Sequence, residues 1–275
     1  AAAPGGQSQS MSEHVPELND VEVFPDGVRQ VTCQDCLKEA KNSLGFDFSM
    51  AFQPIVDVER GGVFAYEALV RGPNGEGAGS VLSQVDESNR YYFDQAARVT
   101  AIRLAAELNI DTLLSINFMP NAVYKPRACI RATMEAAAIY GIDPHKLIFE
   151  VTEAEEILDR NHLKSIFDEY RERGLKRAID DYGEGFAGLN HLIELEPDMV
   201  KIDLNLVRGI DTHKSRQAVV RSTAVMCEEM GITLIAEGVE TQAEYETLRG
   251  FGVQLFQGYW FAKPAFEALP EPRLP

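Results

Sequence analysis

The sequence predicts an α/β fold, a modified TIM (β/α)8 barrel in which one of the first two strands runs antiparallel to the others. Eight short β-rich segments recur within about 220 residues, and helical patterns separate most of them, which favours parallel strands closed into a barrel. Only DVERGG joins the first two segments, which suits a hairpin and is too short for a crossover helix. The eight segments are 50–56, 63–70, 113–118, 147–151, 177–180, 199–203, 233–238 and 253–258.

Apolar residues at helical spacing support the crossovers. Phe93, Ala97 and Ile102 lie on one stripe of the pattern between the second and third β-rich segments. Two later helical patterns end at Gly174 and Gly231, and glycine commonly follows the last turn of a helix. We therefore expect helices in these connections.

The composition limits both the size of the fold and the class of partner. Apolar residues make up 45% of the 275 residues, enough for one barrel-sized domain or two smaller ones. No window approaches ~18 uninterrupted apolar residues, and the polar start does not resemble a secretion signal, so we expect a cytoplasmic protein. The net charge of -17 should repel DNA and anionic membranes. A small anionic ligand is not excluded, because bound divalent cations reverse the field locally.

The first part of the chain differs in composition from the rest. Residues 1–30 are polar and contain three prolines, which predicts a flexible tail, and helical spacing predicts a short lead-in at 31–48 to a domain at 49–270. Cys33 and Cys36 form a lone C-x-x-C pair without the two further ligands of a structural zinc site. We interpret them as an incidental pair on a short helix, with redox chemistry or metal binding as the alternative.

Polar residues stand at the ends of almost all the β-rich segments. In a barrel the carboxyl ends of the strands converge on one face, where active sites are found. A lone acid there is more often a helix N-cap or a salt-bridge partner, and the lysine of the sixth segment could pair with a neighbouring acid. Independent capping would not favour the same chemistry in strand after strand, however. The residues are Glu67, Asn117, Glu150, Asp180, Asp181, Lys201, Asp203, Glu237 and Gln257.

Six of these residues form a set of hard oxygen donors, which suits two Mg²⁺ or Mn²⁺ ions. Two cations about 3.5–4 Å apart are the usual arrangement for in-line displacement at phosphorus. Asp180 would bridge the cations and Asp181 would bind the second. Adjacent side chains of a regular strand face opposite ways, so both acids reach one site only if the strand ends there. The six are Glu67, Asn117, Glu150, Asp180, Asp181 and Glu237.

Eight motifs in residues 49–266 resemble, in order, those of the EAL-domain cyclic di-GMP phosphodiesterases. They are FQPIVD, EALVRG, INF, FEVTE, DDYGEGFAGL, VKID, AEGVET and FQGYWFAKP. One three-letter motif would be weak evidence, but eight in the family's order are strong. The resemblance implies hydrolysis of one phosphodiester bond of cyclic di-GMP to linear pGpG with Mg²⁺ or Mn²⁺.

The resemblance also implies roles for individual residues. The first cation would be held by Glu67, Asn117, Glu150 and Asp180, and the second by Asp180, Asp181 and Glu237. Lys201 would orient the attacking water, because an ammonium acts as a base only if its pKa is depressed. Arg71 would clamp a substrate phosphate, and Glu153 would brace the loop after Asp181. The nucleotide site would be lined by Gln53, Leu69, Gln257 and Pro264.

The loop after Asp181 departs from the family's common pattern. Many relatives read DDFGTGYSSL where this chain reads DDYGEGFAGL, so Glu184 replaces a small residue. In the family this loop couples the metal site to a dimer interface, so the resemblance implies a homodimer through this loop. The departure concerns regulation more than chemistry.

Two other functions stay open beside the phosphodiesterase. The first is a catalytically silent cyclic di-GMP receptor or interaction module on the same fold; degenerate relatives usually lose signature acids or the lysine, which this sequence retains. The second is a barrel enzyme for another phosphodiester, which the EALVRG and FQGYWFAKP motifs disfavour. For the enzyme we expect Ca²⁺, with its looser coordination, to permit binding and to suppress turnover.

Overall fold

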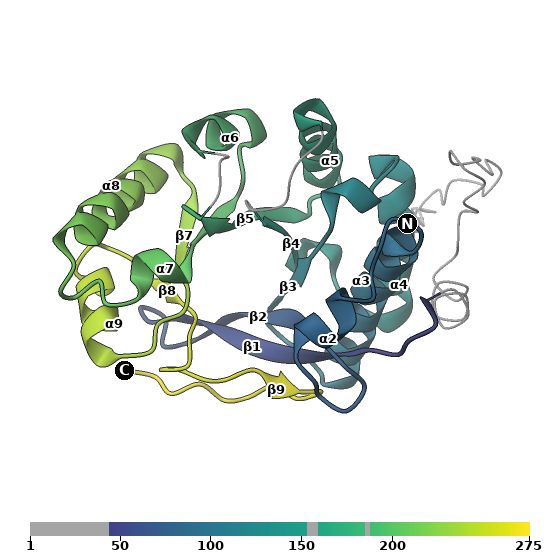
Figure 1. Cartoon of the computed structure of the whole chain (residues 1–275), viewed down its shortest axis with the longest axis horizontal. Coiled ribbons are helices and arrows are strands. Elements are labelled where there is room, and N and C mark those ends of the chain that lie inside the picture. The colour runs from purple at the N-terminus through teal and green to yellow at the C-terminus, as the bar shows by residue number, and fades with distance from the viewer. Residues whose placement is uncertain (1–43, 153–158, 185–187) are drawn as a thin grey trace, which may run out of the picture. The chain divides into compact units, whose positions relative to one another are not determined.

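A computed structural model describes residues 44–152, 159–184 and 188–275, which form a closed barrel with helices between most of its strands (Figure 1). The barrel prediction is confirmed. The predicted tail at 1–30, most of the lead-in at 31–48, and Cys33 with Cys36 lie outside the described residues, and the domain boundaries stay a prediction. The strands are β1 Ser49–Asp57, β2 Gly62–Arg71, β3 Leu113–Asn117, β4 Leu147–Thr152, β5 Lys176–Tyr182, β6 Met199–Ile202, β7 Thr233–Ala236, β8 Leu255–Phe256 and β9 Ala265–Phe266.

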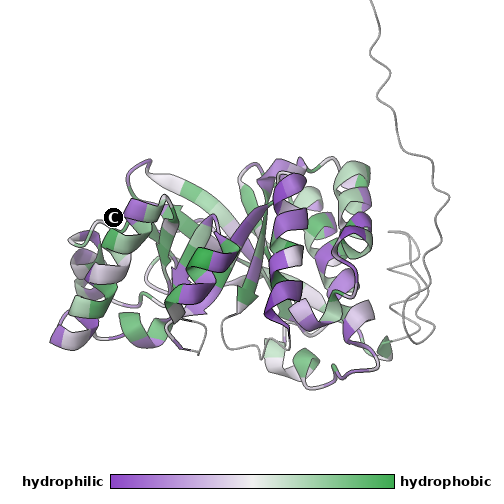
Figure 2. Cartoon of the chain, turned by 90° about the horizontal axis from the view of Figure 1, so that it is seen from above, coloured by the Kyte–Doolittle hydropathy of each residue, from purple (hydrophilic) through white to green (hydrophobic). Residues whose placement is uncertain are grey.

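The helices follow the strands as the sequence patterns predict. α8 is capped by Gly231, which has a φ of 70° and so takes the left-handed conformation that glycine adopts without strain. The helices carry hydrophilic and hydrophobic residues side by side, as the purple and green bands of Figure 2 show. Among the described residues, none of them combines the length and the apolar composition that crossing a bilayer requires. They are α2 Ala78–Leu82, α3 Arg90–Glu107, α4 Pro126–Tyr140, α5 Arg160–Glu172, α6 Gly188–Leu195, α7 Leu204–Val207, α8 Lys214–Met230 and α9 Gln242–Arg249, with 3-10 turns η2 Pro120–Ala122 and η3 Pro144–Lys146.

β1 is the antiparallel strand that the short first connection predicted. It pairs antiparallel with β2 over its whole length, whereas β2 to β8 pair parallel in chain order. Asp57 stabilises the hairpin turn, since its Oδ1 accepts hydrogen bonds from the backbone N–H groups of Glu59 and Arg60 at 3.0 and 2.9 Å. The sheet closes because β1 also pairs with β8.

The seam beside β1 is filled by two short strands. β8 pairs with β1 only at Val56 and Asp57, and β9 takes over at Ala51 and Phe52. The sequence analysis did not predict β9. β9 covers the part of the β1 edge that β8 leaves unpaired, at the face of the barrel where the parallel strands end.

The barrel interior is built in layers, because side chains alternate along a strand with a period of two. A buried apolar cluster fills the lower layer and comprises Ile55, Ala65, Ile148, Ala178, Met199, Ile235 and Leu255. Two residues away from each of these apolar residues, on the same strand or directly after its end, lies a polar residue of the predicted site. Those residues are Gln53, Glu67, Glu150, Asp180, Lys201, Glu237 and Gln257. The apolar layer therefore lies directly beneath the polar layer and closes the site from the barrel interior.

Gly258, directly after Gln257, leaves no room for a side chain. A Cβ there would overlap with the backbone of Val239, which is held by Val239 N–H donating to Gln257 O at 3.1 Å and by Trp260 N–H donating to Val239 O at 3.0 Å. We expect Gly258→Ala to lower the free energy of unfolding by about 1–3 kcal/mol or more, measured by urea denaturation. Gly62→Ala is the matched control, since a Cβ there meets nothing within 4 Å. Equal stability of the two variants would contradict this steric explanation.

Candidate active site

Lys201 lies at the centre of the polar layer, with its side chain fully buried. Its Nζ lies 2.6 Å from Glu237 Oε1, 2.7 Å from Glu150 Oε2, and 3.2 Å from both Glu67 Oε2 and Asp180 Oδ1. Burial alone would lower the pKa of Lys201, but the carboxylates, Asp180 first, raise it well above its ordinary value. The sequence left open whether Lys201 pairs with one acid, and the structure pairs it with four.

One ammonium does not compensate all the acids around it. Burial, the largest cause, raises the pKa of Glu150 to about 8, although Lys201 opposes the shift. Burial and then the charge of Asp180 raise the pKa of Asp181 to about 7, and burial raises the pKa of Glu237 well above its usual value. The excess of negative charge favours protons or cations in this cluster, and carboxylate oxygens are the donors that hard divalent cations prefer.

The structure brings the predicted acids close together in two overlapping groups. Carboxylate oxygens of Glu67, Glu150 and Asp180 lie within 4.8 Å of one another, and so do those of Asp180, Asp181 and Glu237. Asp180 belongs to both groups. The residues present therefore fit two adjacent divalent cations.

Asp180 and Asp181 reach one site through a bulge in β5. Ile179 pairs with Val200 and Tyr182 with Ile202, so two aspartates stand opposite Lys201 alone. Asp181 has a φ of 52°, a left-handed conformation that breaks the alternation of side chains. The sequence analysis expected the strand to end at these two acids, but β5 continues to Tyr182 and the bulge brings the two side chains together.

Neutral donors hold two of the acids in place. Asn117 Nδ2 donates to Glu67 Oε1 at 2.9 Å, and Gln257 Nε2 donates to Glu67 Oε2 at 2.8 Å. Ser115 Oγ donates to Glu150 Oε1. Ser115 was missed by the sequence analysis, although it stands two residues before Asn117 and so shares its face of β3.

Other predicted site residues lie at the edges of this cluster. Gln53 accepts a hydrogen bond from Gln257 at 3.3 Å and donates to Ala262 O at 3.1 Å, so it links β1 to the segment before β9. Pro264 lies half-buried directly before β9. Glu153 lies outside the described residues.

Asp203, the remaining strand-end acid, has the ordinary role that a lone acid often has. It is the N-cap of α7, and its side chain accepts a hydrogen bond from Asn205 N–H at 2.9 Å. The side chain of Asp203 is therefore engaged by the backbone of this helix.

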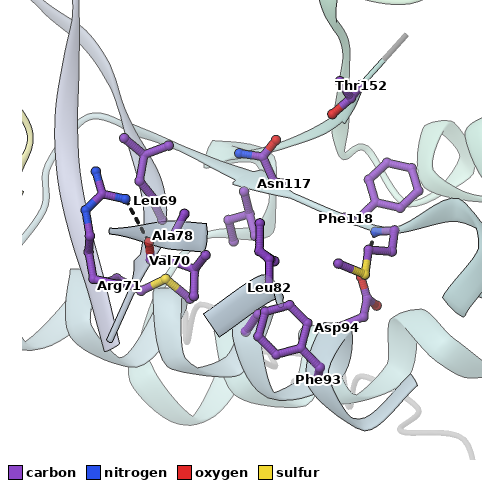
Figure 3. A pocket seen from close by; sticks show the side chains of 15 residues that line it. Leu69, Val70, Arg71, Ala78, Leu82, Phe93, Asp94, Asn117, Phe118 and Thr152 are labelled. Carbon is purple, nitrogen blue, oxygen red and sulfur yellow. Dashed lines mark hydrogen bonds between the residues drawn. The ribbon is translucent and has the colours of Figure 1, made fainter. Parts of the chain in front are cut away.

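A cavity of about 270 Å³ adjoins the cluster between the end of β2 and α3. Figure 3 shows Leu69 and Arg71 on one side of it and Phe118 on the other, with Asn117 between them. Arg71 Nη1 donates to Val70 O at 2.7 Å. Asn117 lines the cavity and also donates a hydrogen bond to Glu67, so it connects the cavity to the acid cluster.

A buried ion pair on α3 supports the far wall of this cavity. Arg98 Nη2 lies 2.7 Å from Asp94 Oδ2, Arg98 Nη1 donates to the hydroxyl of Tyr170 at 2.7 Å, and the guanidinium lies 5.3 Å from the ring centroid of Phe118. Asp94 Oδ1 accepts a hydrogen bond from Met119 N–H at 2.9 Å. The pair thus fixes the backbone just after β3, and the sequence analysis did not identify it.

Comparisons with known proteins locate similar chains. The EAL domain family matches residues 37–264. A standalone versatile EAL protein from Vibrio cholerae O395 in its c-di-GMP-bound form is 49% identical with a TM-score of 0.81, over 83% of this chain and 96% of that one. The manganese/cy-diGMP complex of Klebsiella pneumoniae BlrP1 is 34% identical with a TM-score of 0.78, over 82% and 58%. The cyclic di-GMP phosphodiesterase PA2567 of Pseudomonas aeruginosa is 28% identical over 82% of this chain and 39% of that protein. The chain spans about half or less of the length of the curated relatives that it matches.

Proposed function

The chain belongs to the EAL domain family, and on this premise we propose that it hydrolyses one phosphodiester bond of cyclic di-GMP to linear pGpG, using Mg²⁺ or Mn²⁺. The observation that carries the proposal is the cluster of carboxylates around Lys201, next to a cavity that Arg71 lines. The relatives in complex with cyclic di-GMP and manganese support the choice of substrate and cofactor.

The two groups of acids would hold the two cations. Glu67, Asn117, Glu150 and Asp180 would bind the first, and Asp180, Asp181 and Glu237 the second. When bound, the cations would activate the attacking water and offset the charge that develops at phosphorus. Asn117 already uses its Nδ2 on Glu67, which leaves its carbonyl oxygen as the ligand atom.

Lys201 orients the water and does not remove its proton. An ammonium has three donors and no acceptor, so it can donate to the water and cannot take a proton from it. Arg71 clamps a phosphate oxygen from the end of β2, since a guanidinium presents a fork of donors. Leu69 packs against the nucleotide from the same strand.

The remaining proposed contacts lie along the seam of the barrel. Gln53 and Gln257 join the nucleotide site to Glu67 through their hydrogen bonds, and Pro264 lines the site beside β9. Glu153 would brace the loop after Asp181.

Incubation of the purified protein with cyclic di-GMP tests the proposal. We expect pGpG with Mg²⁺ or Mn²⁺, and binding without turnover in Ca²⁺ or after removal of metal ions. Tight binding with no pGpG in either Mg²⁺ or Mn²⁺ would instead identify a receptor. Turnover of a different phosphodiester in preference to cyclic di-GMP would reject the substrate.

We also propose a homodimer formed by α6 and the loop before it. Leu189 and Ile193 on α6 are 59% and 66% exposed, a large apolar surface for one short helix. Light scattering should give the mass of a dimer at tens of micromolar, and Ile193→Glu should shift it towards the monomer. Ile139→Glu is the control, because Ile139 is 56% exposed but lies on α4. A monomeric wild type would contradict the dimer and would point to repulsion between copies of Glu184.

A further inference from the structure

Ser115 lies in the middle of β3 and faces the polar layer of the barrel. The ladder sets Ser115 beside Glu67 of β2, and sets Asn117, on the same face of β3, beside Glu150 of β4. No part of Ser115 is exposed. A hydroxyl buried this completely is costly unless a protein group satisfies it.

The partner of this hydroxyl is one oxygen of Glu150. Ser115 Oγ donates to Glu150 Oε1, while Glu150 Oε2 lies 2.7 Å from Lys201 Nζ. The two donors come from β3 and β6, on opposite sides of the carboxylate, so together they restrict its rotation. Among the described residues, Ser115 and Lys201 are the donors that reach the carboxylate of Glu150.

The two donors differ in what they leave for a cation. Lys201 is charged, and its attraction for Glu150 competes with that of a cation for the same carboxylate. Ser115 is neutral, so it orients the carboxylate and leaves its charge uncompensated. The amides of Asn117 and Gln257 do the same for Glu67, which indicates a common way of holding these two acids.

We propose that Ser115 is a positioning residue that holds Glu150 in the orientation in which it binds the first divalent cation. This inference rests on the proposed function, because it assumes the cation. The contrasting explanation is that Ser115 is only a small residue that packs well in the barrel. In that case Ser115→Ala would bind the cation as tightly as the wild type.

Isothermal titration calorimetry separates these explanations. Mn²⁺ is titrated into metal-stripped protein without substrate, and the affinity is measured. We expect Ser115→Ala to weaken Mn²⁺ affinity about tenfold or more, the usual effect of removing an outer partner of a ligand. Ser115→Thr keeps the hydroxyl and should keep most of the affinity, even where its extra methyl lowers the melting temperature. Thr133→Val is the matched control, since Thr133 is also fully buried, on α4, and its hydroxyl has no hydrogen-bond partner within the part of the chain that the structure describes.

Kinetics provide a second measurement that a packing role would not change. For Ser115→Ala, the Mn²⁺ concentration that gives half-maximal turnover should rise about tenfold, while kcat at saturating Mn²⁺ returns towards the wild-type value. Wild-type affinity in Ser115→Ala, or an equal loss in Thr133→Val, would overturn the inference and leave the phosphodiesterase intact. Weak Mn²⁺ binding by Ser115→Ala in a protein that forms no pGpG would support the inference and reject the proposed activity. A wild type that binds no Mn²⁺ would reject both.

Discussion

Lys201→Ala is expected to slow pGpG formation by at least two orders of magnitude and to lower the stability of the metal-free protein by about 3–5 kcal/mol. The kinetic effect follows from losing the donor that orients the attacking water. The effect on stability follows because Lys201 is fully buried among four acids, and removing it leaves the ionised ones among them buried without a counter-ion. Affinity for cyclic di-GMP should change by less than about tenfold, or 1.4 kcal/mol, since the lost interaction acts in the transition state.

Urea denaturation with EDTA and with Mg²⁺ measures the change in stability. Mg²⁺ should recover part of the loss, because cations that bind the folded protein compensate the same acids. The control is Lys164→Ala, which removes a pair with Asp168 at 2.7 Å whose side chains are 49% and 43% exposed. Such an exposed pair contributes at most about 1 kcal/mol. If Lys201→Ala unfolds like the wild type in EDTA, Lys201 is not the counter-ion of this cluster.

Asp181→Asn should reduce turnover by at least ~100-fold while cyclic di-GMP still binds, because it removes one charge from the second cation site and keeps the shape of the side chain. Asparagine is a suitable replacement for a structural reason as well. Asp181 has a φ of 52°, and asparagine tolerates this left-handed conformation better than most residues. The bulge in β5 should therefore survive the substitution.

Steady-state kinetics, cyclic di-GMP titration and melting temperature together test this variant. Binding and melting temperature should stay close to wild type while kcat falls. Asp211→Asn serves as the control for loss of one negative charge, because Asp211 is exposed and lies between α7 and α8. Turnover near the wild-type rate in Asp181→Asn would remove Asp181 from the site.

The layer of polar residues was predictable because it depends on a period of two. Glu67, Glu150 and Glu237 each stand two residues beyond an apolar residue of the barrel interior, and this spacing is visible in the sequence. The antiparallel β1 was predictable for a similar reason, since DVERGG is too short for any other connection. Local patterns of this kind require no knowledge of distant partners.

Features that depend on distant partners were not predictable from the sequence. The bulge at Asp181 depends on how β5 pairs with β6, and β9 depends on a backbone edge that β8 leaves open on β1. Hydrogen-bond direction also depends on the fold. Nothing in the sequence shows that Gln257 directs its amide nitrogen at Glu67.

The seam beside β1 has a consequence for the order in which the chain folds. β1 meets β2 across a tight turn, but Val56 meets Phe256 and Ala51 meets Phe266 only after nearly all the intervening chain is in place. Contacts so distant in sequence form late, because the entropy of closing the loop is lost before they contribute. Until then one edge of β1 is unpaired, and β8 and β9 of a second copy of the chain can pair with it in place of the chain's own β8 and β9. Refolding at high concentration should therefore produce exchanged dimers that persist on dilution and separate only when the barrel unfolds.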